Sequence, residues 1–260
     1  MTFELLVAAV EKDIEKLIDK MGIDSNAVIV NQCDEDNLKR IVYKDYGITI
    51  VNSSKRGVGL SRNTALDNAT ADILLFGDED IVYDKDYESK VISAFKKYPQ
   101  ASVITFNFDV DSRRRTYTNT EDHIVKWNNY GRYPAYAIAV KRRAILDNNI
   151  CYSLLFGGGA KYSNGEDSLF LHDCLKAGLK IMAVTTKLGR EEYRESTWFR
   201  GYTEKFFFDR GVLYHFLYGK AAGLLGFRFL YNNRKTMCKS IGLFKAYGLL
   251  RNGIREGKTL

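Results

Sequence analysis

The sequence contains only two prolines, three histidines and four cysteines among its 260 residues. So few prolines, together with 45% hydrophobic residues, are typical of a compact fold with a substantial core and argue against disorder or repeats. The cysteines lie far apart without CxxC or Cys/His spacing: Cys33, Cys151, Cys174 and Cys238. A structural zinc site is therefore not expected, and we interpret these residues as reduced, buried thiols.

The sequence also lacks the usual marks of export and membrane insertion. It starts MTFELLVAAVEKD, with an acidic residue where a signal peptide is basic and without a small-residue cleavage site. Further on, no run approaches about 18 uncharged apolar residues, because Arg210, Lys220 and Arg228 interrupt the C-terminal region. We therefore expect a cytoplasmic protein whose first apolar segment is a core strand, with no spanning helix.

The net charge of +7 is unevenly distributed. From residue 201 onward there are eleven Lys and Arg against three Asp and Glu, a net charge of +8, which leaves residues 1–200 at −1. Aromatic and apolar residues are mixed with these cations, which favours an amphipathic surface that binds anionic lipid head groups. The alternative is packing on the rest of the chain, which we expect of about half of these apolar residues. Nucleic acid is not an expected partner, because no recognised binding motif accompanies the charge.

Short apolar runs alternate with helical patterns in the first half of the chain. Strands are predicted at 3–10, 26–30, 47–51, 72–76 and 101–108, and helices at 14–21, from about residue 60, and at 84–98. This alternation predicts an α/β fold with a mostly parallel sheet and helices on both faces. Ligands of such sheets bind at the carboxyl ends of the strands, where the polar residues after Val10, Val30, Val51 and Phe76 are expected.

The second half has a different pattern. Residues 109–133 are polar and rich in Arg and Asn, which indicates loops and edge structure, and AYAIAV at 135–140 indicates a strand. A glycine loop then leads into a helix that stops at Gly178, and KIMAVTT at 180–186 indicates another strand. Beyond Tyr202 the pattern is helical.

The predicted strand at 72–76 is followed by Gly77 and three acidic residues, Asp78, Glu79 and Asp80. Like charges crowded together repel, so water must solvate them or a cation must neutralise them. Alternate residues of an extended segment point the same way, so Asp78 and Asp80 are expected to face one ligand while Glu79 faces away. Carboxylates suit Mn²⁺ or Mg²⁺, and two of them leave coordination positions for water and phosphate oxygens. The alternative is a solvated turn with incidental acids.

Two longer segments resemble one protein family. KRGVGLSRNTALDNATADILLFGDED resembles the segment that defines family 2 glycosyltransferases of the GT-A fold, in which Ala/Ser-Arg-Asn precedes an apolar strand ending in DxD. LLFGGGAKYSNGEDSLFLHDCLKAGLKIMAV resembles the acceptor loop and Glu-Asp motif of that family, followed by a helix and a strand. The resemblance covers most of residues 3–200 and is closest to the bacterial exopolysaccharide and capsule branch.

The donor-binding segments depart from the family pattern. Residues 9–12 read Ala-Val-Glu-Lys where the family has a Pro-Val-Tyr-Asn-like segment, and residues 31–34 read Asn-Gln-Cys-Asp in place of Asp-Asp-Gly-Ser. The resemblance implies that the nucleotide-sugar donor binds to Val10, Glu11, Asn31, Gln32, Arg62, Asp78 and Glu79. The planar guanidinium of Arg62 suits a phosphate or a carboxylate of the metal site. The alternative role of Arg62 is that of a cation on the surface of its helix.

The resemblance also implies catalytic and acceptor residues. Asp80 and Asp78 would hold the metal on the donor diphosphate, with Asp78 contacting the ribose in part of the family. Asp167 is implied as the general base, kept ionised by the N–H groups of a helix start; an ordinary acidic first turn is the alternative. The implied acceptor and loop residues are Gly158, Gly159, Glu166 and Trp198. The glycines either let a loop close over the substrates or serve a plain loop, and Trp198 either stacks on a sugar or is a buried aromatic.

These implications define a predicted enzyme and its parts. It is a metal-dependent, inverting glycosyltransferase with Mn²⁺ or Mg²⁺ as cofactor, which moves a sugar from a nucleotide donor, UDP in our expectation, to a growing lipid-linked surface polysaccharide or oligosaccharide. The catalytic domain is expected at 1–200, with a donor half at 1–110 and an acceptor half at 111–200. The basic helical extension at 201–260 is expected to bind the inner face of the cell membrane.

Two other functions were weighed against this one. A sugar-phosphate nucleotidyltransferase has a related sheet, but its Gly-rich, Arg/Lys signature after the first strand is missing from VAAVEKD. A non-catalytic, membrane-associated protein that binds nucleotide sugars is the second alternative. Retention of Asp78, Asp80 and Asp167 together argues against a decayed site.

Overall fold

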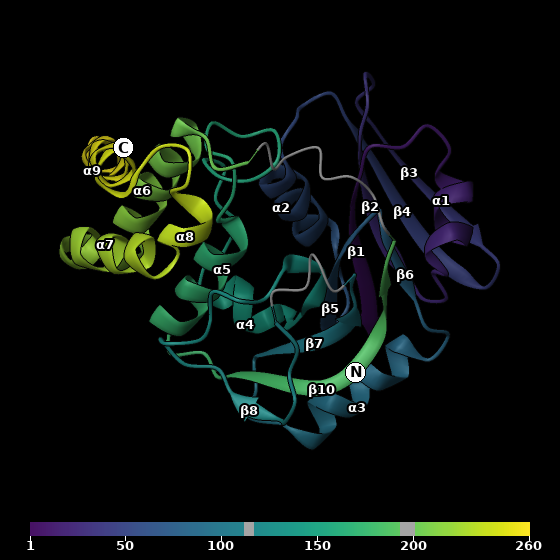
Figure 1. The fold of residues 1–260 in the computed structure, drawn as a ribbon. Coiled ribbons are helices and arrows are strands. Elements are labelled where there is room, and N and C mark those ends of the chain that lie inside the picture. Colours follow the sequence, from purple (N-terminus) through teal and green to yellow (C-terminus); the bar gives the residue numbers. More distant parts are fainter. Residues whose placement is uncertain (112–116, 193–200) are drawn as a thin grey trace.

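The computed structural model describes residues 1–111, 117–192 and 201–260. Its strands form one large twisted sheet with helices packed on both faces, and the helices of residues 204–257 gather beside one end of the sheet (Figure 1). The predicted α/β fold class is therefore confirmed. Trp198 lies outside the described residues.

Every strand and helix predicted in the first half is present. The elements are β1 (Phe3–Ala9), α1 (Ile14–Met21), β2 (Ala27–Gln32), β4 (Tyr46–Ser53), α2 (Val58–Asn68), β5 (Ile73–Asp78), α3 (Tyr87–Lys97) and β7 (Val103–Asp109). Local chemistry fixes the ends of α1. The Asp13 side chain accepts a hydrogen bond from the Lys16 backbone N–H at its start, and Gly22, with φ of 66°, ends it.

The second half contains shorter elements. They are β8 (His123–Ile124), the 3₁₀ turn η1 (Ala135–Ala137), β9 (Ile138–Lys141), α4 (Arg142–Asp147), α5 (Glu166–Lys176) and β10 (Ile181–Glu191). The strand predicted at 135–140 is therefore half turn and half strand. The helix predicted to stop at Gly178 does so, with Gly178 at φ of 76°.

Two further strands were not indicated by the sequence, β3 (Asn37–Tyr43) and β6 (Ile81–Tyr83). β3 forms an antiparallel hairpin with β4 at the edge of the sheet, and its side chains are exposed or half-buried. It therefore lacks the apolar run that marks a buried strand. β6 has only three residues and pairs with the end of β10.

The strand order is β3-β4-β2-β1-β5-β9-β7-β10-β6, with β8 paired to β10. Four of these pairings are parallel and five are antiparallel, so the sheet is mixed, whereas a mostly parallel sheet was expected. The parallel expectation holds for the block β4-β2-β1-β5. It fails at β9, which lies antiparallel between β5 and β7. A long polar connection precedes β9, and such a connection does not force parallel pairing as a helical crossover does.

Alternating side chains of the central strands fill two separate cores. Leu5 and Val7 of β1 point to the core that α1 and α3 cover. Leu6 of β1 and Phe76 of β5 point to the opposite core, which α2, α4 and α5 cover. The sheet is therefore buried on both faces, as the continuous apolar runs of its central strands indicate.

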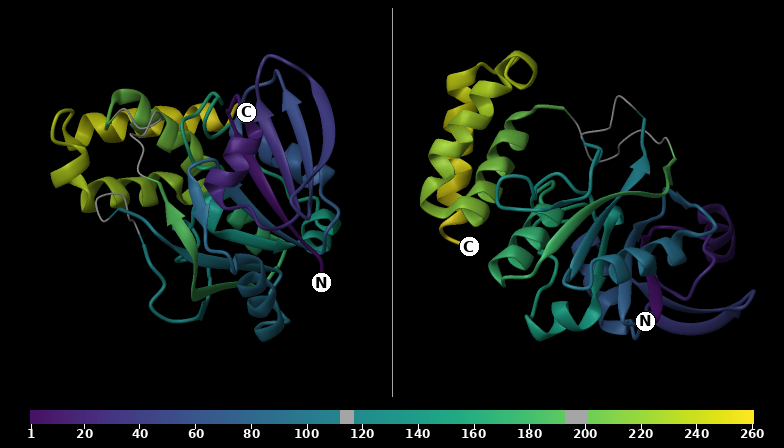
Figure 2. Two further views of the ribbon diagram at one scale, coloured as in Figure 1. Left: turned by 90° about the vertical axis from the view of Figure 1, so that its right-hand side faces the viewer. Right: turned by 90° about the horizontal axis from the view of Figure 1, so that it is seen from below.

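The C-terminal region is helical, as predicted. Its elements are α6 (Glu204–Tyr218), η2 (Gly219–Ala221), α7 (Ala222–Asn232), α8 (Arg234–Met237) and α9 (Leu243–Gly257). They share a hydrophobic cluster of their own, centred on Phe207, Leu230 and Leu250. Both views of Figure 2 show them side by side along one flank of the molecule. Within the described ranges, no helix has the length and apolar character needed to cross a membrane.

One face of α6 packs on the sheet-containing part. Val212 and Leu213 form a joint cluster with Phe156, Tyr162 and Leu169, which precede or belong to α5. The domain limits at 200 and 201 stay predictions. Hydrophobic contacts nevertheless join the residues before 192 to α6. The C-terminal helices are thus part of the packed structure and not a separate tail.

Glycines allow α6 and α9 to cross closely. A methyl group at Gly253 of α9 would collide with the Phe208 carbonyl oxygen of α6, whereas Gly248 on the same helix has open space around it. We expect Gly253→Ala to lower the free energy of unfolding by roughly 1–3 kcal/mol, the usual cost of overpacking. Gly248→Ala, the matched control, should raise it by about 0.5–1 kcal/mol through helix propensity. Urea unfolding of both variants tests this, and similar stabilities would contradict the close crossing.

Candidate active site

The carboxyl ends of β4, β2, β1 and β5 meet at one edge of the sheet. Asp78 is the last residue of β5, beside Ala8 of β1, and Glu79 and Asp80 form the turn into β6. The expectation that Asp78 and Asp80 alternate along one extended strand is therefore wrong, because Asp80 lies in a turn. The three acids nevertheless lie at the predicted edge.

Hydrogen bonds bring four of the expected donor-binding residues together. The Val10 backbone N–H donates to Glu79 Oε2 at 2.6 Å. The Glu11 N–H donates to Asn31 Oδ1, and Asn31 Nδ2 donates back to the Glu11 carbonyl, both at 2.8 Å. The buried Asn31 amide thus joins the ends of β1 and β2, and Glu79 bonds to the backbone just after β1.

Gln32 supports the loop before α2. Its side-chain oxygen accepts a hydrogen bond from the Gly57 N–H at 3.1 Å, and its carbonyl accepts one from Arg56 at 2.7 Å. Asn31 and Gln32 therefore take part in hydrogen bonds within the protein. Their role in donor binding, like that of Val10, Glu11 and Glu79, stays a prediction.

The centre of the site is Arg62 on α2, which is only 4% exposed. Its Nη2 donates to Asp78 Oδ1 at 2.9 Å, and its Nη1 donates to Asp167 Oδ1 at 3.1 Å and to Glu166 Oε1 at 3.2 Å. Its guanidinium also lies over the ring of Tyr152, 5.1 Å from the ring centre. Arg62 is thus no surface cation; it joins the acidic end of β5 to the start of α5.

This network shifts the protonation equilibria of its members. Burial alone would lower the pKa of Arg62, but the surrounding carboxylates, with Asp78 and Asp167 foremost, raise it well above its usual value. Burial and then the charge of Glu166 raise the pKa of Asp167, and Arg62 opposes them only in part. We expected the helix start to favour the ionised form of Asp167, and burial acts against that effect. A carboxylate with a raised pKa is a better proton acceptor.

Glu166 has its own positioning bonds. Its Oε2 accepts a hydrogen bond from the Gly165 N–H at 3.1 Å while its Oε1 faces Arg62. Gly165 has φ of 126°, a conformation that favours glycine, and it lets the chain turn sharply into α5. Together these contacts orient the first turn of α5, which carries Asp167.

The glycine loop lies against the start of α2. The Val58 N–H donates to the Gly158 carbonyl at 2.8 Å, and Gly159, at φ of 81°, approaches the Gly57 backbone closely. Neither Gly158 nor Gly159 lines the cavity in front of Asp167. Their role as a loop that closes over the substrates stays a prediction.

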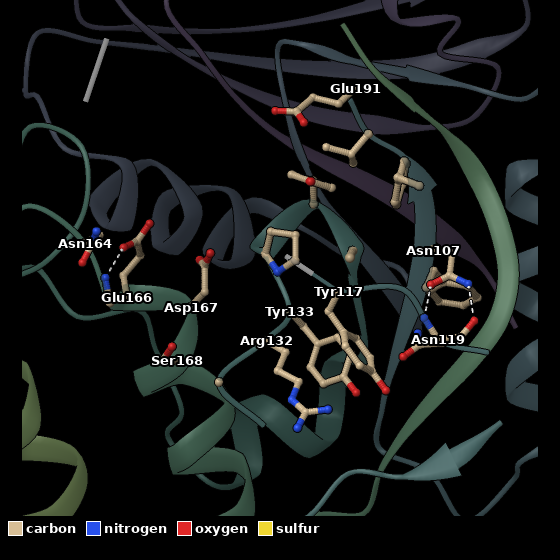
Figure 3. A pocket seen from close by; sticks show the side chains of 18 of the residues that line it. Asn107, Tyr117, Asn119, Arg132, Tyr133, Asn164, Glu166, Asp167, Ser168 and Glu191 are labelled. Atoms are coloured by element: carbon tan, nitrogen blue, oxygen red, sulfur yellow. Dashed lines mark hydrogen bonds between the residues drawn. The ribbon is translucent and has the colours of Figure 1, made fainter. Parts of the chain in front are cut away.

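Asp167 faces a cavity of about 480 Å³ (Figure 3). Glu166, Asp167 and Ser168 of α5 form one wall, and the connection between β7 and β9 contributes Tyr117, Arg132, Tyr133 and Tyr136. The volume lies in the range of small-molecule sites. Sequence analysis missed these wall residues, because residues 109–133 offered only a polar composition, without a motif.

The acidic end of β5 fits a divalent cation. Asp78 remains 28% exposed although it pairs with Arg62, and carboxylate oxygens are the donors that Mn²⁺ and Mg²⁺ prefer. In the described part of the chain, no three acidic, histidine or cysteine side chains form a group that could hold a metal ion by themselves. The metal site at Asp78 and Asp80 stays a prediction.

Comparisons with known proteins identify the family and the fold. The family model described as glycosyl transferase family 2 matches residues 8–155. No curated protein matches the chain. Among solved structures, S. aureus TarS 1–349 in complex with UDP-GlcNAc is similar, with a TM-score of 0.61 and 17% identity over 90% of this chain and 73% of that chain. The same protein in complex with UDP gives 0.59 and 15%, over 92% and 74%. At such identities, the structural likeness shows a common fold.

Removal of the Arg62 cation should destabilise the fold in a pH-dependent way. Arg62→Met leaves three carboxylates without their partner, at a cost of roughly 3–5 kcal/mol near neutral pH. Without Arg62, which opposes the effect of burial, the folded-state pKa of Asp167 lies further above its unfolded value. The loss is therefore small near pH 4, where protons neutralise the site, and grows as the pH rises.

Thermal unfolding at about pH 4.5 and 7.5 measures this difference. Arg228→Met, which removes an exposed arginine, is the control and should have a small effect at both pH values. An equal loss of stability for Arg62→Met at the two pH values would contradict the triple ion pair.

Proposed function

The chain belongs to glycosyl transferase family 2, and we propose that it transfers a sugar from a uridine diphosphate donor to a hydroxyl group of a growing surface polysaccharide, with inversion at the anomeric carbon. The observation that carries this proposal is the Arg62 network, which joins Asp78, expected beside the donor diphosphate, to Asp167. Uridine is proposed because TarS structures of the same fold hold UDP-GlcNAc and UDP. The family assignment favours glycosyl transfer over nucleotidyl transfer.

In the proposed reaction the acceptor oxygen forms a bond to the anomeric carbon while the bond from that carbon to the diphosphate breaks. The electron pair of the broken bond stays on the diphosphate, and the hydroxyl proton goes to Asp167. Asp78 and Asp80 would hold Mn²⁺ or Mg²⁺, which when bound neutralises charge on the leaving diphosphate. Arg62 holds Asp78 and Asp167 at fixed positions relative to each other, as the alignment of leaving group and base requires.

Substitutions of the two aspartates should separate binding from chemistry. Asp167→Asn keeps size and shape but cannot take a proton, so sugar transfer should fall by roughly 10²–10⁴ while UDP affinity in Mn²⁺ stays unchanged. Asp80→Asn should instead weaken UDP binding, and the loss should vanish when Mn²⁺ is removed from both proteins. Calorimetric titration of UDP and a transfer assay measure the two effects. Near-normal transfer by Asp167→Asn would sink the proposed base.

The C-terminal helices support a membrane-bound acceptor. Along α7, the exposed residues Leu224, Phe227, Arg228 and Tyr231 recur at helical spacing, so they form one stripe, with Leu224 75% exposed. Lys220 and Lys235 lie exposed at either end of this helix. We propose that this face binds anionic lipid at the inner side of the cell membrane and that the acceptor is linked to lipid.

The stripe can be tested without truncation. Deletion of residues 205–260 would uncover the joint cluster at Phe156 and Leu169, so point variants are preferable. Leu224→Ser combined with Phe227→Ser should weaken binding to phosphatidylglycerol vesicles by at least about tenfold, because two inserted apolar side chains are lost. Leu38→Ser on the distant edge strand β3 is the control. Unchanged vesicle binding by the double variant would rule out insertion of α7.

A further inference from the structure

The cavity that Asp167 faces also receives two arginines, Arg210 from α6 and Arg132 from the loop before η1. We propose that these arginines bind a negatively charged group of the acceptor, a phosphate or a carboxylate, while the acceptor hydroxyl meets Asp167. This inference rests on the proposed function in so far as the cavity receives the acceptor. It adds a substrate class to that function: acceptors that carry an anion close to the reacting hydroxyl.

Arg210 has an apolar and aromatic environment. Its guanidinium carbon lies 5.3 Å from the ring centre of Phe206 and 5.4 Å from that of Phe229. Within the described residues its Nε has no hydrogen-bond partner, and the ionisable groups that interact with it are tyrosines, which are neutral at neutral pH. Burial lowers the pKa of Arg210, but an arginine stays protonated at neutral pH. The cavity wall thus carries a cation that the described residues do not neutralise.

Such a cation is costly in the free protein. Arg210 is half-buried and so loses part of its hydration, and stacking on aromatic rings compensates for that loss only in part. The comparison with Arg62 is instructive, because that arginine is buried beside three carboxylates. Arg62 is thus paired with acids of the protein, whereas Arg210 has aromatic neighbours and lines a cavity that a ligand can enter.

The acidic residue next to Arg210 is engaged elsewhere. Asp209 is almost fully buried, and its Oδ2 accepts hydrogen bonds from the Ser163 N–H at 2.9 Å and from Lys205 Nζ at 2.6 Å. Asp209 thus supports the loop before α5 and leaves Arg210 unneutralised. Helix α6 therefore presents the carboxylate of Asp209 to that loop and the guanidinium of Arg210 to the cavity.

Arg132 adds a second cation to the same cavity. Its guanidinium carbon lies 4.7 Å from the ring centre of Tyr117, and Figure 3 shows its side chain together with Asp167 among those that line the cavity. The acids Glu166 and Asp167 are paired with Arg62. Planar guanidinium groups bind phosphate and carboxylate through two parallel hydrogen bonds, which suits a fixed anion position.

The test uses inorganic phosphate as the probe, with the full-length protein saturated with UDP and Mg²⁺ so that the donor site is filled. Isothermal titration should detect phosphate binding to the wild type and an affinity at least tenfold lower in Arg210→Met. Arg210→Lys, which keeps the charge but loses the fork, should lie between them. Arg40→Met removes the same charge from the exposed edge strand β3 and should bind phosphate like the wild type.

Several outcomes would overturn the inference: no phosphate binding by the wild type, equal binding by Arg210→Met, or an equal loss in Arg40→Met. If Arg210→Met does not fold, as judged by circular dichroism, Arg132→Met takes its place with the same expectation. UDP affinity is measured in each protein. Absence of UDP binding with the phosphate result intact would refute the proposed donor while the anion site stands.

A second series identifies the source of the anion. Glycerol 3-phosphate represents a phosphate within a repeating unit, acetate a sugar carboxylate, and farnesyl diphosphate the phosphate of a lipid carrier. The probe that binds most tightly to the wild type, and loses most affinity in Arg210→Met, identifies the class. If none of the three loses affinity in that variant, the acceptor does not reach Arg210 and the inference is wrong.

Discussion

The ion pairs of Arg62 are the interaction on which the site depends. One buried guanidinium faces three carboxylates that come from β5 and from the first turn of α5. Its helix, α2, is fixed in turn by Asn63, which exchanges hydrogen bonds with the Tyr152 backbone at 2.7 and 2.9 Å. Because carboxylates crowded together repel, this arrangement holds only while the cation is present. Arg62 therefore sets the spacing between the acidic strand end and the proposed base.

The C-terminal helices support the same region from the other side. Ser163, two residues before Gly165, is bound by Asp209 of α6, and Lys161 and Tyr162 both bond to Glu256 of α9, at 2.8 and 3.1 Å. The loop that leads into α5 is thus held between α2 and the helices of residues 204–257. A carboxylate needs a fixed position to take a proton efficiently. These contacts fix the loop that carries Asp167 into place, and none of them occupies Asp167 itself.

Sequence reasoning succeeded where burial leaves a strong local pattern. Central strands such as β1 and β5 are continuous apolar runs, and the acidic residues after β5 interrupt such a run at the edge where ligands bind. It failed where pairing depends on distant segments, as for the exposed edge strand β3 and the antiparallel β9. The ion-pair partners of Arg62 could not be predicted for the same reason, because Asp167 lies 105 residues away in the chain. A cation's burial cannot be read from its neighbours in sequence.

The cations of the C-terminal region have two kinds of environment. Cations such as Arg228 and Lys235 lie exposed to solvent. Salt there screens their interactions with charges more than about 10 Å away. Arg210 lies among aromatic rings on a cavity wall, where little water screens it and an approaching anion interacts more strongly. Both kinds belong to helices that share one hydrophobic cluster, so the proposed lipid-binding face and the proposed acceptor-binding wall are packed together. A lipid-linked acceptor held by the first would meet the second without a hinge between them.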